Sequence, residues 1–211
     1  MSVSTPGQGG TVPAKLAVVG QFTADRERLL IRGISPKEIR DRYFAAERTA
    51  DGRIKAIDHG DNSVVGRSKA DPYARIFGSE LVMWDLFAAW WDWPKQSLGE
   101  SERIAGRECT LVRSQTDVAA SPVREVVSCV DLDGRLSLRT QFFGNKHQLI
   151  RTIMVEKTIR KEFGLKAAKR LSITGEGGTT SEVEIYGGDE HYAVSADTFT
   201  VLDSGSSIDQ Q

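Results

Sequence analysis

Hydrophobic and polar residues alternate along most of the chain after residue 13. Leu16, Val18 and Phe22 are separated by other side chains, and a second apolar run at 29–31 follows a polar segment. Alternation with a period of two is typical of a strand that buries one face, and a polar turn between two such runs indicates a hairpin. The sequence therefore predicts a β-hairpin at the start of the folded region.

Turn-forming residues recur at short intervals in the second half of the chain. Glycine, asparagine and proline clusters separate short alternating runs, which we expect to be strands at 109–113, 124–130, 136–143, 149–156, 170–173 and 183–186. Runs of this kind with one apolar face form antiparallel meanders. We expect a flexible leader at 1–13, a single domain at 14–203 and a flexible tail at 204–211. The fold class is mainly β (α+β), with a curved antiparallel sheet.

Residues 80–93 differ from the rest because they contain no glycine or proline and are rich in helix formers. We expect a helix that Pro94 ends. All four tryptophans lie in it, and Trp84, Phe87 and Trp91 share one face at helical spacing. A helix that is apolar almost all round is buried on both sides or faces an apolar partner.

Three interpretations of this helix remain open. It is a core helix that contacts a strand through aromatic side chains, a lid whose inner face lines an acyl cavity, or a helix at a membrane surface. The few polar side chains in the segment are acidic, which fits the membrane surface least well.

Cys109 and Cys129 flank a loop centred near residue 119. In a symmetric hairpin they would face each other across two strands, at a distance close to that of a disulfide. A disulfide in an oxidising compartment and two buried reduced thiols both fit this position. No histidine has zinc-ligand spacing around either cysteine, so we expect no metal.

Composition excludes several classes of protein. The 211 residues carry a net charge of −1, which gives no electrostatic basis for nucleic acid as a partner. No apolar run approaches the length of a membrane-spanning helix. The glycines at 175–178 lack the lysine of a phosphate-binding loop, and Ser79 lacks the surrounding glycines of a hydrolase nucleophile. We therefore expect no enzyme activity and no cofactor.

Several segments resemble the LolA-like family of outer-membrane lipoprotein-sorting proteins. The most diagnostic runs from Ile76 to Glu80 and is followed closely by Trp84-Asp85-Leu86. The other matching segments are 35–40, 98–100 with Gly106 and Cys109, 129–131, 149–152 and 197–200. The resemblance implies an open antiparallel half-barrel with a helix packed on its concave face.

The resemblance also implies a function. It predicts a non-enzymatic periplasmic carrier that binds lipoprotein acyl chains or another lipid, with Phe77, Trp84, Phe87 and Trp91 as the ligand-binding residues. The alternative is a cell-envelope interaction or sensor module that has the same scaffold with a filled interior. Residues 1–13 have no apolar signal-peptide core. We expect a location in the periplasm or at the outer membrane, with the signal peptide removed.

Overall fold

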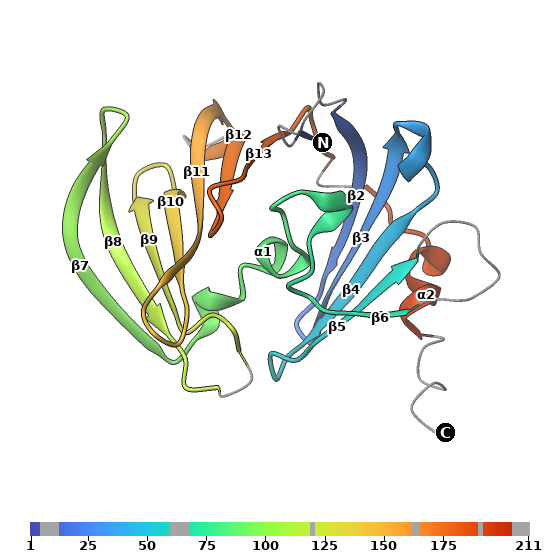
Figure 1. Cartoon of the computed structure of the whole chain (residues 1–211), viewed down its shortest axis with the longest axis horizontal. Coiled ribbons are helices and arrows are strands. Elements are labelled where there is room, and N and C mark those ends of the chain that lie inside the picture. The colour runs from blue at the N-terminus through green and yellow to red at the C-terminus, as the bar shows by residue number, and fades with distance from the viewer. Residues whose placement is uncertain (5–12, 60–67, 119–120, 162–164, 190–191, 204–211) are drawn as a thin grey trace. The chain divides into compact units, whose positions relative to one another are not determined.

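We describe a computed structural model of the chain, which covers residues 1–4, 13–59, 68–118, 121–161, 165–189 and 192–203 (Figure 1). The chain forms two compact units. Among the described residues, those within 1–4, 13–88 and 186–203 form unit 1, and those within 89–185 form unit 2. Unit 2 is thus inserted into unit 1 along the sequence. The expected single domain at 14–203 stays a prediction.

The strands of unit 1 form an antiparallel sheet in the order β6-β5-β4-β3-β2-β1. They are β1 (Ser2–Ser4), β2 (Ala14–Phe22), β3 (Arg26–Ser35), β4 (Tyr43–Thr49), β5 (Ile54–His59) and β6 (Ser68–Ala70). The short helices are η1 (Lys37–Ile39), η2 (Ile76–Gly78), α1 (Met83–Phe87), η5 (Ala196–Phe199) and α2 (Thr200–Asp203). Figure 1 shows α1 and α2 on opposite sides of this sheet.

Each face of the unit 1 sheet has its own apolar layer. Successive side chains of a strand point to opposite faces, and directly paired residues share a face. Ile31 pairs with Phe44, and both are buried on the face where Phe44 contacts Phe77 of η2. We call this the η2 face. Leu30 pairs with Ala45 on the opposite face, where Phe199, Val201 and Leu202 cover the sheet.

The strands of unit 2 form a second antiparallel series, in the order β13-β12-β11-β10-β9-β8-β7. They are β7 (Lys95–Ile104), β8 (Arg107–Gln115), β9 (Glu125–Asp131), β10 (Leu136–Phe143), β11 (Leu149–Arg160), β12 (Lys166–Gly175) and β13 (Thr180–Glu184). Six residues of β9 are buried, so both of its faces are covered. The prediction of a mainly β, antiparallel fold is confirmed.

The expected leader at 1–13 differs from the structure at its start. Ser2 and Val3 pair with Lys15 and Ala14, and the amino group of Met1 donates a hydrogen bond of 3.0 Å to the carbonyl oxygen of Leu16. This pairing was missed because Val3 is the only large apolar residue of the strand, and its partner is distant in sequence. Residues 5–12 and the expected tail at 204–211 lie outside the described residues.

The prediction of one continuous helix over 80–93 is wrong. Helix α1 ends at Phe87, Ala88 has left-handed backbone angles with φ 48°, and a single 3-10 turn, η3 (Ala89–Asp92), follows. The break coincides with the boundary between the two units. Because α1 and η3 belong to different units, the aromatic side chains before and after Ala88 are buried in different places.

Candidate functional site

The segment before α1 is a tight loop that fixes Phe77 over the sheet. Arg75 forms a β-bridge with Val82, and the backbone N–H of Ile76 donates to the carbonyl oxygen of Leu81 at 2.8 Å. The Ser79 hydroxyl donates to the carbonyl oxygen of Ile76 at 2.7 Å. Phe77 has a positive φ of 48° inside this loop. The closed loop thus holds the residue whose ring covers the η2 face.

Phe77 is half-buried between a strand and a cation. Its ring contacts that of Phe44 edge-on, with centroids 5.1 Å apart, and the Arg42 guanidinium lies 5.7 Å from the ring centroid. Edge-to-face aromatic pairs and cation–π contacts both stabilise such an arrangement. The sequence predicted Phe77 as a ligand-binding residue, and the structure places its ring at the surface of an apolar layer.

Trp84 and Phe87 lie one helical turn apart on α1, as expected. They are 3% and 5% exposed, and the Trp84 ring lies 5.4 Å from that of Tyr73. The N–H of Val82 donates to a carboxylate oxygen of Asp85 at 3.2 Å, which caps the start of the short helix. Both aromatic side chains are therefore buried, and that of Trp84 packs against Tyr73 of unit 1.

Trp91 does not share a face with Trp84 and Phe87. It lies beyond the break at Ala88, in η3 of unit 2, and is 40% exposed. Of the four predicted ligand-binding residues, Phe77, Trp84 and Phe87 belong to unit 1 and Trp91 belongs to unit 2. The expected common face assumed a helix without interruption, and the left-handed Ala88 ends that periodicity.

The neighbouring Trp90 is buried in unit 2. Its ring contacts Phe142 of β10 edge-on at 5.3 Å, and the Arg151 guanidinium lies 4.8 Å from the centroid of Phe142. The side-chain amide of Gln96 donates to the carbonyl oxygen of Trp90 at 3.0 Å and accepts from the Ser114 hydroxyl at 2.8 Å. These two hydrogen bonds of Gln96 connect η3 to strands β7 and β8.

The apolar face predicted for residues 14–22 is partly uncovered in the structure, and none of its residues was predicted as a ligand contact. Leu16, Val18, Gly20 and Phe22 point to the η2 face, because Val18 pairs with the buried Ile31. Leu16 is buried, but Val18 is 40% and Phe22 is 63% exposed. The alternation of residues 14–22 was visible in the sequence. Which part of that apolar face stays uncovered depends on the position of η2 and α1, which the sequence does not specify.

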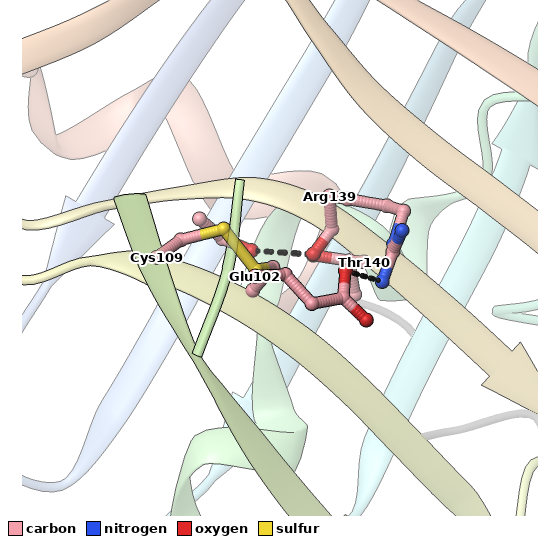
Figure 2. Close-up of a disulfide and its surroundings, with 6 residues drawn as sticks. Glu102, Cys109, Arg139 and Thr140 are labelled. Carbon is pink, nitrogen blue, oxygen red and sulfur yellow. Dashed lines mark hydrogen bonds and ion pairs between the residues drawn. A yellow bond between two sulfur atoms is a disulfide. The ribbon is translucent and has the colours of Figure 1, made fainter. Parts of the chain in front are cut away.

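Cys109 and Cys129 form a disulfide between β8 and β9, with Cα atoms 5.2 Å apart. They are not directly opposite each other, because Cys129 pairs with Leu111 and the hairpin is centred one position later than expected. Figure 2 shows the disulfide beside Arg139, whose guanidinium donates to the Glu102 carboxylate at 2.6 Å. Leu138 packs against both cysteines in a small core.

A buried ion pair lies at the end of β9. The Lys166 ammonium donates to Asp131 at 2.7 Å, and the N–H of Gly134 donates to the other carboxylate oxygen at 2.9 Å. The hydrogen bond from Lys166 and that from Gly134 hold the pKa of Asp131 below its ordinary value of 3.8. This arrangement joins the start of β12 to the β9–β10 turn and is structural.

Two further features are absent from the described residues. Within them, no three histidine, cysteine or acidic side chains come together as a cation site. None of the helices in the described ranges is long and apolar enough to cross a membrane.

Comparison with known proteins finds a likeness of fold. No family model matches the chain, and no curated protein matches it. A domain from Vibrio parahaemolyticus, named as an outer membrane lipoprotein-sorting protein domain, superposes with a TM-score of 0.83 at 12% identity, over 96% of this chain and 88% of that one. A DUF1329 family protein from Desulfovibrio piger has a TM-score of 0.75 at 14% identity, over 87% of this chain and 80% of its own.

A LolA superfamily protein from Nitrosomonas europaea has a TM-score of 0.66 at 13% identity, over 87% of this chain and 80% of its own. These likenesses show that the chain has a LolA-like fold, as the resemblance of the sequence predicted. At such low identity they show the fold alone, so the function has to be argued from the residues of this chain.

Proposed function

We propose that this protein is a non-enzymatic carrier that binds a hydrophobic ligand, either a lipoprotein acyl chain or another lipid. The proposed location is the periplasm or the outer-membrane surface. Two observations support it. The chain has a LolA-like fold, and one of its solved relatives in fold is named for outer membrane lipoprotein sorting. The apolar strip on β2 also leaves part of the η2 face without cover.

The uncovered strip is the observation that carries the proposal. Val18 and Phe22 expose apolar surface beside side chains of the same face that are fully buried, such as Ile31. Removing apolar surface from water stabilises a complex by about 25 cal/mol per Å². An acyl chain laid along β2 would extend the apolar layer of unit 1 without requiring a polar partner.

In this proposal, the predicted ligand-binding residues of the η2–α1 segment add to the site that the β2 strip forms. Phe77 is half-buried at the edge of the layer and is the one of them best placed to contact a ligand directly. Trp84 and Phe87 would support it from the interior. Trp91 remains a proposed contact because of its exposed ring, on the separate surface of η3.

The burial of Trp84 and Phe87 favours a second candidate function. If the interior is fully packed by such side chains, the same scaffold would serve as an interaction or sensor module of the cell envelope. The two functions differ in what the η2 face does. A carrier binds lipid there, whereas a module leaves that strip without ligand.

A titration with a long-chain fatty acid tests the proposal. Binding is followed by native mass spectrometry and by tryptophan emission, since all four tryptophans lie at 84–93. We expect one ligand to bind, and Val18→Asn and Phe22→Asn each to weaken binding by about tenfold. The matched control is Leu98→Asn, which alters a side chain that is 78% exposed on β7.

One result would contradict the carrier function, and another would contradict the proposed site on β2. Absence of any bound fatty acid in the wild-type protein would favour the interaction module. Equal weakening by Leu98→Asn and by the β2 variants would place the ligand elsewhere. Unfolding curves of all three variants accompany the titration, because a loss of folding would otherwise imitate a loss of binding.

A further inference from the structure

The free end of the β11–β12 hairpin carries a high density of positive charge. Six basic side chains lie in its described part, against Glu156 as the acidic one: Lys157, Arg160, Lys161, Lys166, Lys169 and Arg170. We call this segment, residues 156–161 and 165–170, the basic hairpin end. Lys157, Arg160, Lys161 and Arg170 are all exposed.

The strand register places like charges opposite each other. Lys157 pairs with Arg170, and Arg160 pairs with Lys166. Like charges directly across a strand pair destabilise a sheet, and opposite charges stabilise it. Acidic groups balance part of this charge, because Arg170 also pairs with Glu184 on β13 and Lys166 binds Asp131. What remains is a net excess of positive charge at this end of the hairpin.

One side of the basic hairpin end is fixed to the rest of unit 2. The Arg107 guanidinium donates to the Thr158 hydroxyl at 2.8 Å, and Lys166 is held by Asp131. The backbone N–H of Lys166 also donates to the carbonyl oxygen of Gly134 at 3.1 Å. These contacts occupy the side to which Thr158 points, so the hairpin is anchored while its other side remains outward.

An apolar side chain lies on that outward side. Ile159 follows Thr158 in the strand and so points the opposite way, and it is 42% exposed. Lys157, two positions before Ile159, points to the same side, and so does Arg170, with which Lys157 pairs; Arg160 points with Thr158 to the anchored side. The ion pair of Arg170 with Glu184 has a long separation of 3.8 Å between exposed groups, and such pairs contribute little. The outward side thus combines positive charge with one exposed isoleucine.

This combination fits the surface of an anionic lipid bilayer. Basic side chains near such a surface are attracted to the lipid phosphates, and an apolar side chain between them can enter the interfacial region. An acidic protein would match the charge but would not require the exposed isoleucine. We propose that the basic hairpin end docks the protein on membranes that contain anionic phospholipid.

Vesicle cosedimentation with the full chain tests this docking surface. Vesicles of phosphatidylcholine alone are compared with vesicles that also contain phosphatidylglycerol, at low and at high salt. We expect binding to the anionic vesicles only, with a strong decrease in high salt because screening weakens attraction between exposed charges. Absence of binding to anionic vesicles at low salt would overturn the proposal and would favour an acidic protein partner.

The charge-reversal variant Lys157→Glu locates the surface. We expect it to weaken binding to anionic vesicles by about tenfold. The new glutamate would face Arg170, so the protein should unfold at the same temperature as the wild type or higher. Equal loss of binding in the control Lys37→Glu, which makes the same charge change at an exposed position of unit 1, would overturn the proposal.

A second variant tests the role of the apolar side chain. Ile159→Ser should reduce binding to anionic vesicles severalfold without changing its salt dependence, because the charges remain. Unchanged binding of this variant would contradict the proposed insertion of Ile159 into the bilayer surface. The docking surface does not depend on the proposed acyl site. The variant Phe22→Asn should bind vesicles as the wild type does, so the two proposals can fail separately.

Discussion

At the scale of single residues, Asp131 shows how a buried carboxylate holds two segments together. It is 5% exposed and accepts hydrogen bonds from Lys166 and Gly134. We predict that Asp131→Asn lowers the free energy of unfolding by about 1–3 kcal/mol, since the neutral amide leaves the Lys166 ammonium without its counter-charge. Urea denaturation at neutral pH measures this loss.

The ion pair of Asp131 with Lys166 also leads to a prediction about the pH dependence of stability. Because the pKa of Asp131 in the folded protein lies below its ordinary value of 3.8, its contribution is complete above that pH. It is lost as the pH falls through the lowered pKa. The difference in unfolding free energy between the wild type and Asp131→Asn should therefore shrink below about pH 4. Asp133→Asn, in the same turn but exposed, is the matched control and should leave the free energy of unfolding at neutral pH nearly unchanged.

At the scale of elements, the break in the aromatic segment lies at Ala88. An L-residue with side chain is disfavoured in the left-handed region, and glycine is the usual residue at such helix ends. We predict that Ala88→Gly stabilises the protein by about 0.5–1 kcal/mol, after allowance for the greater freedom of glycine in the unfolded chain. Thermal unfolding measures the shift.

Ala89→Gly is the matched control for that substitution. Ala89 is the first residue of η3 and 6% exposed, so removal of its side chain should destabilise the fold. If both glycine variants destabilise equally, the left-handed conformation of Ala88 in solution would be contradicted.

The aromatic segment also shows what a sequence pattern can predict. Residues 80–93 contain no glycine or proline, so nothing local marks Ala88 as a helix end. The break follows from tertiary structure, because Trp84 and Trp90 are buried in different units. The strands were more predictable, since alternation along residues 136–143 depends only on which face of the strand is buried.

The candidate site was less predictable than the sheet. The family-like segment at 76–80 led to Phe77, which lies at the edge of the apolar layer. Val18 and Phe22 are equally apolar in the sequence, but their exposure depends on what covers them in three dimensions. The periodicity of β2 identifies an apolar face and does not reveal that part of it lacks cover.

The disulfide is the second feature to consider at the scale of elements. It joins β8 to β9 across a sequence separation of 20 residues. A cross-link over a loop of this length stabilises a fold by roughly 3 kcal/mol in the chain-entropy model. We predict that the double variant Cys109→Ala/Cys129→Ala loses about that amount in chemical denaturation.

Thiol titration in denaturant without reductant accompanies that measurement. Protein made in an oxidising compartment should contain no free thiol. Two free thiols in such material would contradict the disulfide in solution. The small core around Leu138 should survive in the reduced protein, because reduced cysteine side chains are themselves apolar enough to stay buried.

At the scale of the whole molecule, the last described residues complete unit 1. Phe199, Val201 and Leu202 cover Ala45 and Ile57 on one face of the sheet, and Phe199 is 2% exposed. We predict that Phe199→Ala lowers the free energy of unfolding by about 3–5 kcal/mol, because it leaves a cavity over the middle strands. Tyr192→Ala, which alters a side chain that is 63% exposed, should cost less than about 1 kcal/mol. Comparable losses in the two variants would contradict this packing.

The order in which these parts are synthesised has a consequence for biogenesis. Unit 2 is contiguous over Ala89–Ile185 in the described structure, so its strands can pair as soon as they leave the ribosome. Most strands of unit 1 are synthesised before unit 2. The helix α2 (Thr200–Asp203), which covers one face of their sheet, is synthesised after unit 2. The sheet of unit 1 therefore lacks this cover until residues 199–203 have been synthesised, and its apolar face stays accessible to a chaperone during that time.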